Sequence, residues 1–281
     1  MRNANVSLLM SIYKNETVNN FNACMESILR QTFLPVEIVL VKDGPLTKEL
    51  DQAIAEAVEK YPNNFWLVPL EKNYGLGEAL SIGLQKTSFS LVARMDTDDI
   101  MREDRIEKEY LYLQAHPEVA IVGSNIVEFE GTVDNIIGQR EVKETNSEIV
   151  NYSKRRNPFN HMTVMYRKER VLEAGNYLPL PGFEDYFLWV RMLKNGSQGA
   201  NILEPLVYAQ AGEEMINRRG GLAYFKQGAV GRWKIYKNGF GSIIDYGITF
   251  IGHTIFCLIP PKMRSTFYNT LLRKKITHGE D

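Results

Sequence analysis

The stretch of sequence that decides the fold runs from residue 91 to residue 100 and reads Leu-Val-Ala-Arg-Met-Asp-Thr-Asp-Asp-Ile. Its apolar first part predicts a buried strand. Three carboxylates follow within four residues, and they would repel one another unless a cation lay among them. Mg²⁺ takes oxygen ligands and usually binds through one or two carboxylates together with the phosphates of a substrate. The spacing Asp96-x-Asp98 therefore predicts a site for a metal and a diphosphate.

Two further residues of this stretch bear on that prediction. Arg94 adds a fixed charge for phosphate, or it pairs with Asp99. Aspartate is also a favoured N-cap residue, and we expect Asp99 to cap the helix that begins near Met101. The alternative to a metal site is a solvated acidic turn in front of that helix.

The residues around this stretch alternate between strand and helix patterns. The expected strands are Val6–Ile12, Val36–Val41, Phe65–Val68, Leu91–Met95 and Ala120–Val127, and the expected helices are Thr17–Gln31, Leu50–Tyr61, Gly75–Leu84 and Arg102–His116. Strands separated by helical patterns of this length indicate βαβ units. The sequence therefore predicts an α/β fold with a mostly parallel central sheet flanked by helices.

Polar clusters follow three of the expected strands: Tyr13–Glu16, Asp43 and Asp96–Asp99. In parallel sheets, ligands bind outside the carboxyl ends of the strands, so these clusters are expected to share one site. A dinucleotide-binding oxidoreductase is excluded because the first strand leads into a turn without glycine, and Gly75-Leu76-Gly77 lacks the third glycine of that fingerprint. The chain also has no Walker A sequence.

Composition describes an ordinary globular enzyme. The chain has 281 residues, of which 44% are hydrophobic and 24% charged, which is close to globular averages. The two cysteines, Cys24 and Cys257, lie far apart and indicate neither a disulfide framework nor a zinc site. The first residues run directly into a strand without the apolar segment of a signal peptide. We expect a cytoplasmic location.

Charge is distributed unevenly along the chain. Residues 218–281 contain eleven Lys and Arg but three Asp and Glu, whereas the preceding residues contain 22 and 31. A basic tail on an acidic body predicts an anionic partner. Because the tail is also apolar, membrane lipid is favoured over nucleic acid.

Seven segments of the chain share an order and spacing with a known family: Val6–Tyr13, Ser27–Phe33, Glu37–Gly44, Asn73–Leu80, Ala93–Ile100, Asn160–Tyr166 and Gly182–Arg191. Together they resemble family-two glycosyltransferases of the GT-A fold, and among these the bacterial enzymes that build capsular polysaccharides and exopolysaccharides. The resemblance extends over residues 5–220. Two departures are Lys42-Asp43, where many members carry two acidic residues, and Ser11 in place of a common proline.

The resemblance implies a nucleotide-sugar donor held at the strand ends. Asp43 matches the aspartate that accepts a hydrogen bond from the ring N–H of the base, which would favour uracil. The alternative for Asp43 is a turn-forming residue before Gly44. Tyr13 and Glu16 would lie beside the base and ribose. Asn73 and the glycines after it, Gly77 among them, would let the backbone approach the nucleotide.

The resemblance also assigns the chemical roles. Asp98 would bind Mg²⁺ or Mn²⁺ directly, and Asp96 would contact the ribose or the metal. Asp185 would be the general base that deprotonates the acceptor hydroxyl, with Glu184 orienting the acceptor. The alternative is that Glu184 and Asp185 only cap the helical run Tyr186–Leu193.

Two further residues are assigned to the acceptor. His161 would contact the acceptor or a phosphate, although a lone histidine beside an apolar strand is often structural. Trp189 would form a platform for a sugar ring, or would belong to the core.

We expect a GT-A domain at residues 1–220, with a nucleotide-binding half (1–100) and an acceptor half (101–220), and a C-terminal helical extension at 221–281. The uncharged run from Tyr246 to Pro261 is too short to span a bilayer, and basic residues follow it. This order is typical of an element in a membrane interface. The alternative is packing on the enzyme or on a second subunit, which would make the protein an oligomer.

The sequence thus predicts an inverting, metal-dependent transferase at the inner face of the cell membrane. It would move a hexose or N-acetylhexosamine from a UDP-sugar to a hydroxyl of a lipid-linked glycan in capsule or exopolysaccharide synthesis. The alternatives are a sugar nucleotidyltransferase, which would need a glycine-rich loop after the first strand, and a non-catalytic sugar-nucleotide-binding relative.

Overall fold

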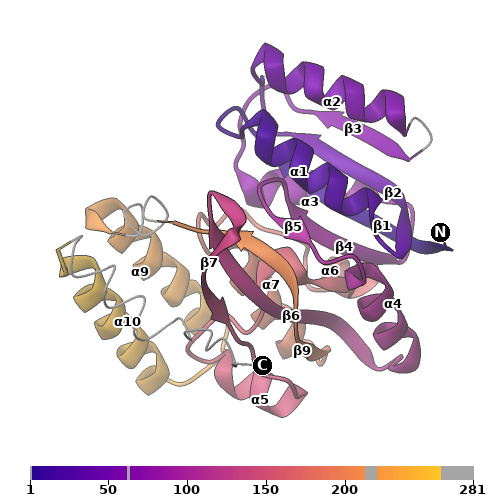
Figure 1. Ribbon diagram of the computed structural model, residues 1–281. Helices are drawn as coiled ribbons and strands as arrows, with labels where there is room; N and C mark the ends of the chain where they lie inside the picture. Colours follow the sequence, from indigo (N-terminus) through magenta and orange to yellow (C-terminus); the bar gives the residue numbers. More distant parts are fainter. Residues whose placement is uncertain (1, 62–63, 213–219, 261–281) are drawn as a thin grey trace, which may run out of the picture.

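The computed structural model describes residues 2–61, 64–212 and 220–260, and within them nine strands form one sheet with helices on both faces (Figure 1). The strands are β1 (Arg2–Ile12), β2 (Phe33–Lys42), β3 (Phe65–Pro69), β4 (Leu91–Asp96), β5 (Ile100–Met101), β6 (Val119–Glu130), β7 (Thr132–Arg140), β8 (Met165–Arg167) and β9 (Gln198–Gln210). The helices are α1 (Val18–Leu29), α2 (Lys48–Lys60), α3 (Leu76–Lys86), α4 (Arg105–Ala115), α5 (Asn146–Tyr152), α6 (Lys168–Glu173), α7 (Glu184–Lys194), α9 (Gly221–Lys237) and α10 (Ile243–Leu258), with a 3₁₀ turn η1 (His161–Thr163). The predicted α/β fold is confirmed.

The strand order is β3-β2-β1-β4-β8-β6-β9-β5, with β7 paired to the outer part of β6. Strands β1 to β4 pair in parallel, as the βαβ pattern predicts. Their register places the ends of three strands side by side, because Ser11 is opposite both Val41 of β2 and Asp96 of β4. The polar clusters that follow these strands therefore emerge at one edge of the sheet.

The residues of β1 show why the sheet is covered on both faces. Val6, Leu8, Met10 and Ile12 point to one face, where they join buried residues of α1, α2 and α4. Leu9 points to the other face, where it joins buried residues of α3, α6 and α7. Strands buried on both faces are continuous apolar runs, which is the pattern that the sequence shows.

The sequence analysis did not predict the strand that joins the two halves of the sheet. Strand β8 lies between β4 and β6 and is antiparallel to both, so β6 keeps the direction of β4 without being its neighbour. The expected helix at Arg102–His116 begins later, at Arg105, because Ile100 and Met101 pair with β9. Both differences arise from short strands whose partners are distant in sequence.

The C-terminal helices α9 and α10 lie side by side, at the opposite end of the molecule from α2 and β3 (Figure 1). Ile235 of α9 packs with residues of α7, including Tyr186 and Val190. Arg155 forms an ion pair of 2.6 Å with Asp245 of α10. The expected helical extension is thus present between residues 221 and 258, while its basic residues from 262 onward lie outside the described part of the chain. The predicted domain boundary near residue 220 stays a prediction.

Candidate active site

A cavity of about 370 Å³ lies at the carboxyl ends of β1, β2 and β4. We call it the strand-end cavity; its lining residues are Ser11, Tyr13, Glu16, Asp43, Asn73, Gly75, Leu76, Asp96, Thr97 and Asp98. Six of the residues predicted to bind the donor or metal meet in this wall. The parallel register of the strands brings them together although 85 residues separate the first from the last.

Asp43 organises one side of the strand-end cavity. Its carboxylate accepts hydrogen bonds from the backbone N–H groups of Tyr74 (2.7 Å) and Gly75 (3.1 Å), and the Asn73 side chain donates to its carbonyl oxygen. Asp43 thereby holds the loop before α3, and each of its oxygens has a second lone pair for a ligand. Gly44 follows with φ of 89°, and a Cβ there would lie 2.6 Å from the backbone nitrogen of Asn73. The turn alternative for Asp43 and the ligand role are therefore compatible.

Glu16 links the end of β1 to the turn that contains Asp96, Asp98 and Asp99, which we call the acidic turn. One carboxylate oxygen accepts from the backbone N–H of Thr17 and the side chain of Asn20, and the other accepts from the hydroxyl of Thr97 at 2.6 Å. Glu16 thus orients the turn between Asp96 and Asp98. Its predicted contact with the nucleotide stays a prediction.

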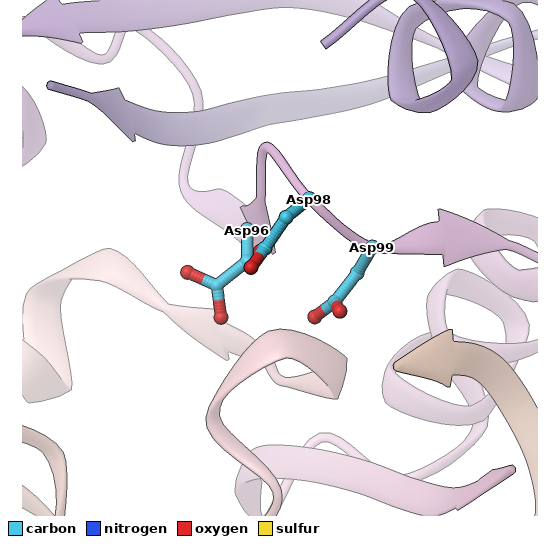
Figure 2. Close-up of side chains that lie close together, drawn as sticks. All are labelled: Asp96, Asp98 and Asp99. Atoms are coloured by element: carbon cyan, nitrogen blue, oxygen red, sulfur yellow. The ribbon is translucent and has the colours of Figure 1, made fainter. Parts of the chain in front are cut away.

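The carboxylates of Asp96, Asp98 and Asp99 project to the same side of the turn between β4 and β5 (Figure 2). Each offers an oxygen, and the three oxygens lie within 4.8 Å of one another. Burial, followed by the charges of Asp96 and Glu16, raises the pKa of Asp98 to about 7. Asp99 is 2% exposed, and its Oδ2 has no hydrogen-bond partner among the described residues. Burial also raises the pKa of Asp99. Carboxylates this close and half-buried to buried fit a hard divalent cation.

Asp99 does not cap a helix as predicted. Its Oδ1 accepts the backbone N–H of Gln210 at 2.8 Å, and the residues that follow it form β5. Asp99 therefore ties the acidic turn to the end of β9. The sequence could not show this bond because its partners are 111 residues apart.

Arg94 requires a correction. Its side chain is 1% exposed and forms an ion pair with Asp96 rather than with Asp99. A guanidinium buried to this degree cannot reach the phosphates of a donor in the strand-end cavity. Arg94 instead holds Asp96 in orientation from the protein interior, and its positive charge offsets part of the negative charge of the three aspartates.

A second cavity, of about 250 Å³, lies beside the start of α7. We call it the α7 cavity; its lining residues are Glu128, Arg140, Asn157, Phe159, His161, Met162, Gly182, Asp185, Ala209, Gln210 and Ala211. Gln210 belongs to this wall and also donates its N–H to Asp99. This hydrogen bond ties the wall of the α7 cavity to Asp99, the residue after Asp98 of the strand-end cavity.

Asp185 lies in the first turn of α7 with its carboxylate held at both oxygens. The backbone N–H of Tyr186 and the side-chain amide of Asn157 each donate to it at 2.6 Å. Burial raises the pKa of Asp185, while these two hydrogen bonds lower it. A half-buried carboxylate that is fixed in orientation and raised in pKa is suited to accept a proton.

His161 lines the same cavity from η1. Its Nε2 is 3.1 Å from the hydroxyl of Tyr177, and its ring packs edge-on against Trp189. Burial, with a smaller effect of Arg94, holds the pKa of His161 well below its usual value. The imidazole is therefore neutral near pH 7, which opposes the phosphate alternative and leaves hydrogen bonding to an acceptor.

Two predicted site residues belong to the core instead. Trp189 is fully buried among Phe159, Tyr166 and Tyr177, so it cannot form a platform for a sugar. Gly77 is buried inside the start of α3, where a Cβ would lie 2.8 Å from the Glu184 side chain. It permits α3 to pack closely on α7, and Gly75 lines the strand-end cavity in its place.

Glu184 packs against Gly77, and burial raises its pKa to about 7. Its predicted contact with the acceptor stays a prediction.

Four residues of the α7 cavity and its surroundings were not predicted. Asn157 positions Asp185, and Tyr177 contacts His161. Glu128 is 1% exposed and lies 3.1 Å from Arg140 in an ion pair on the cavity wall. An ion pair in a cavity presents both acceptors and donors, which suits hydroxyl groups of a sugar. These residues lie on β6, β7 and loops without motif spacing, so only the folded chain could reveal them.

Comparison with known proteins agrees with this geometry. The model of the family described as "Glycosyl transferase family 2" matches residues 7–175. An uncharacterized glycosyltransferase of Haemophilus influenzae is 38% identical over 95% of this chain and 99% of its own length. The amylovoran biosynthesis glycosyltransferase AmsE of Erwinia amylovora is 40% identical over 78% of this chain and 81% of its own.

A third relative is the UDP-Gal:alpha-D-GlcNAc-diphosphoundecaprenol beta-1,3-galactosyltransferase of Escherichia coli, 34% identical over 95% of this chain and 96% of its own. Among solved structures, TarS of S. aureus in complex with UDP-GlcNAc superposes with a TM-score of 0.63 at 19% identity, over 83% of this chain and 66% of that one. The mannosyltransferase PcManGT from Pyrobaculum calidifontis, in complex with GDP-Man and Mn²⁺, has a TM-score of 0.57 at 14% identity, over 95% and 87%.

These likenesses establish the class of the protein first: the fold is that of GT-A glycosyltransferase structures. The chain belongs to glycosyl transferase family 2. The resemblance read from the sequence is confirmed.

Proposed function

We propose that this protein is an inverting, metal-dependent glycosyltransferase that moves a hexose or N-acetylhexosamine from a UDP-sugar to a hydroxyl of a lipid-linked glycan during synthesis of a bacterial polysaccharide. One observation carries the proposal. The acidic turn of the strand-end cavity is joined through Asp99 and Gln210 to the α7 cavity, which contains Asp185. A donor in the first cavity would therefore present its sugar to an acceptor in the second.

The donor is proposed to lie along the strand ends. Asp43 accepts the ring N–H of the base, and Tyr13 and Asn73 flank the nucleoside. Asp98 and Asp96 hold Mg²⁺ or Mn²⁺, which when bound offsets the charge that develops on the leaving diphosphate. The relative from Escherichia coli is named for a UDP-hexose donor, which supports the nucleotide.

The acceptor is proposed to enter the α7 cavity. Asp185 accepts the proton of the attacking hydroxyl, and Asn157 keeps its carboxylate in the receiving orientation. Attack on the face of the anomeric carbon opposite the diphosphate inverts that centre. Glu128 and Arg140 bind other hydroxyls of the acceptor sugar, and His161 contributes a neutral hydrogen-bonding group.

The lipid-linked nature of the acceptor is proposed because the same relative from Escherichia coli is named for a diphosphoundecaprenol-linked sugar. The AmsE relative is named for the synthesis of a polysaccharide. Action at the cytoplasmic face of the cell membrane, and use in capsule or exopolysaccharide synthesis, are part of the same proposal. Membership of glycosyl transferase family 2 argues against the alternative that the protein is a sugar nucleotidyltransferase.

A hydrolysis panel tests the donor. Full-length protein with Mn²⁺ is incubated with UDP-, GDP- and dTDP-sugars, and released nucleotide is measured. We expect release from one or more UDP-hexoses, and no release above the Asp98→Asn background from the other two classes. Turnover of a GDP- or dTDP-sugar instead would overturn the assignment of UDP as the donor nucleotide.

A transfer assay tests the acceptor. The donor found in the panel is offered with a sugar on a polyprenyl diphosphate and with the same sugar on a short water-soluble group. Faster transfer to the lipid-linked sugar supports the proposed acceptor class. Equal rates of transfer to the two acceptors would contradict the proposal that the acceptor is lipid-linked.

A further inference from the structure

Helix α10 is oriented with its polar side chains inward and its aliphatic side chains outward. Asp245 is 8% exposed and His253 is 5% exposed, and both contact protein groups: Asp245 pairs with Arg155, and His253 is 3.3 Å from the carbonyl oxygens of Tyr224 and Phe225. The outward side chains are aliphatic. Surface helices of globular proteins have the reverse arrangement, with the apolar face inward.

The outward aliphatic residues form a continuous stripe, which we call the α10 stripe. Its members and exposed fractions are Ile244 (67%), Ile248 (48%), Ile251 (59%), Ile255 (54%) and Leu258 (78%). Their spacing alternates between four and three residues, which places them on one face of a helix. Contiguous exposed apolar surface of this kind marks a site of interaction.

The length of α10 decides how it can meet a bilayer. Sixteen residues extend about 24 Å, which is short of the ~30 Å hydrocarbon core. Among the residues with described positions, no helix has the length and hydropathy needed to cross a membrane. A helix with one apolar face and this length suits a position parallel to the membrane, within the headgroup boundary.

Charge indicates which partner covers the stripe. Residues 220–260 contain three exposed lysines, Lys226, Lys234 and Lys237, and a half-buried Arg232 that lies over the ring of Phe183. Their one acidic side chain, Asp245, is paired with Arg155. A second copy of this chain would bring a second surface of the same sign. An anionic lipid surface supplies the opposite charge.

Aromatic side chains join the two C-terminal helices. Trp233 of α9 is 43% exposed, lies beneath the ammonium of Lys237, and packs against Tyr236 and Tyr246. Tyr246 lies on the face of α10 opposite the stripe, so this contact holds α10 on α9 and leaves the stripe facing outward.

We propose that the α10 stripe lies in the interface of an anionic lipid bilayer and docks the enzyme on it. Helix α9 contacts both α10 and α7, so it connects the docking surface to the start of α7. Gly231 of α9 lies against Phe183, which precedes α7 and is two residues from Asp185. If the proposed function holds, a lipid-linked acceptor would reach the α7 cavity from the surface on which the enzyme lies.

Vesicle co-sedimentation of the full-length protein tests the proposal. The vesicles contain phosphatidylcholine with 30% phosphatidylglycerol, or phosphatidylcholine alone, and the stripe variant is Ile248→Gln with Ile255→Gln. Glutamine preserves helix propensity. The matched control is Leu111→Gln with Leu172→Gln, which changes two exposed aliphatic residues on the helices α4 and α6.

We expect the partition coefficient on anionic vesicles to fall at least tenfold in the stripe variant and less than twofold in the control. Melting temperature and UDP-sugar hydrolysis should match wild type in both variants, since neither pair belongs to a cavity. Wild-type binding should weaken as salt rises, because ions screen the electrostatic part. Hydrolysis of the UDP-sugar tests the proposed function separately from docking. If the wild-type protein hydrolyses no UDP-sugar, the proposed function fails, and the vesicle result still decides the docking proposal.

Two outcomes would overturn the docking proposal. One is equal vesicle binding by wild type and the stripe variant, which would assign binding to basic residues alone. The other is absence of vesicle binding together with a dimer, seen by light scattering, that the stripe variant dissociates. That result would assign the stripe to a second copy of the chain.

Discussion

Replacing Asp185 by Asn removes the proposed base and keeps the size of the side chain. The one amide oxygen can still accept the N–H of Tyr186, while the hydrogen bond from the side chain of Asn157 is lost. It cannot accept the proton of a hydroxyl. Base catalysis contributes about 10²–10⁴-fold, or ~3–5 kcal/mol of transition-state stabilisation, so we expect kcat for transfer to fall by that factor.

Donor binding should survive the same change. Asp185 lies in the α7 cavity, whereas the nucleotide is assigned to the strand-end cavity. UDP affinity, measured by calorimetry with Mn²⁺, should therefore stay within twofold of wild type. Burial raises the pKa of Asp185, so its ionised form opposes folding above that pKa, and a neutral amide should leave the melting temperature equal or higher.

Asn157→Ala is the companion variant, because it keeps the base and removes its support. The hydrogen bond from Asn157 lowers the pKa of Asp185. Its loss should raise that pKa and move the acidic limb of the kcat profile to higher pH, with a smaller loss of rate than Asp185→Asn. The reasoning is refuted if Asp185→Asn keeps kcat within tenfold of wild type, or if it loses UDP binding.

Other consequences can be measured on the same protein. Asp98→Asn should weaken UDP affinity at least tenfold with Mn²⁺ and little with EDTA, in calorimetry; equal loss in both would remove Asp98 from the metal site. The pKa of Asp98 is raised from 3.8 to about 7, so the metal-free protein should lose stability between pH 4 and 7, and the rise in melting temperature with Mn²⁺ should be larger at pH 8 than at pH 6. Trp189→Ala should cost ~3–5 kcal/mol in denaturant unfolding because the ring is fully buried, whereas Tyr13→Ala should weaken UDP binding without that cost. Gly77→Ala would place a methyl 2.9 Å from the carbonyl oxygen of Leu178, and a loss of ~1–3 kcal/mol is expected; unchanged stability would contradict the packing role.

The sequence alone determined the first half of the fold, residues 1–100. Its strands are apolar runs joined to their neighbours by single helices, so local periodicity is sufficient to place them. Thr17 caps α1 through a bond to the N–H of Asn20, and the helix begins where its cap predicts. The parallel register then brings Asp43 and Asp96 to one sheet edge, as the rule for parallel strands requires.

The tertiary structure decided the second half of the fold and the roles of several side chains. Strands β5 and β8 contain two and three residues and pair with strands that are distant in sequence. Segments this short show no periodic pattern from which a strand could be predicted. The roles of Arg94 and Trp189 depended on burial, which the residue type does not report. Arg94 supports Asp96 because β4 is covered on both faces, and Trp189 belongs to the core because α7 packs its inner side on the sheet.

The same division applies to the proposed catalytic residues and to the C-terminal helices. The pattern of apolar and basic residues predicted an amphipathic tail, but only the packing of α9 and α10 shows that Asp245 and His253 point inward and the isoleucines outward. Asp185 could be inferred from its motif, while Asn157 and Gln210 could not. A motif reports residues that are neighbours in sequence, whereas a hydrogen bond across 28 or 111 residues exists only after the chain has folded.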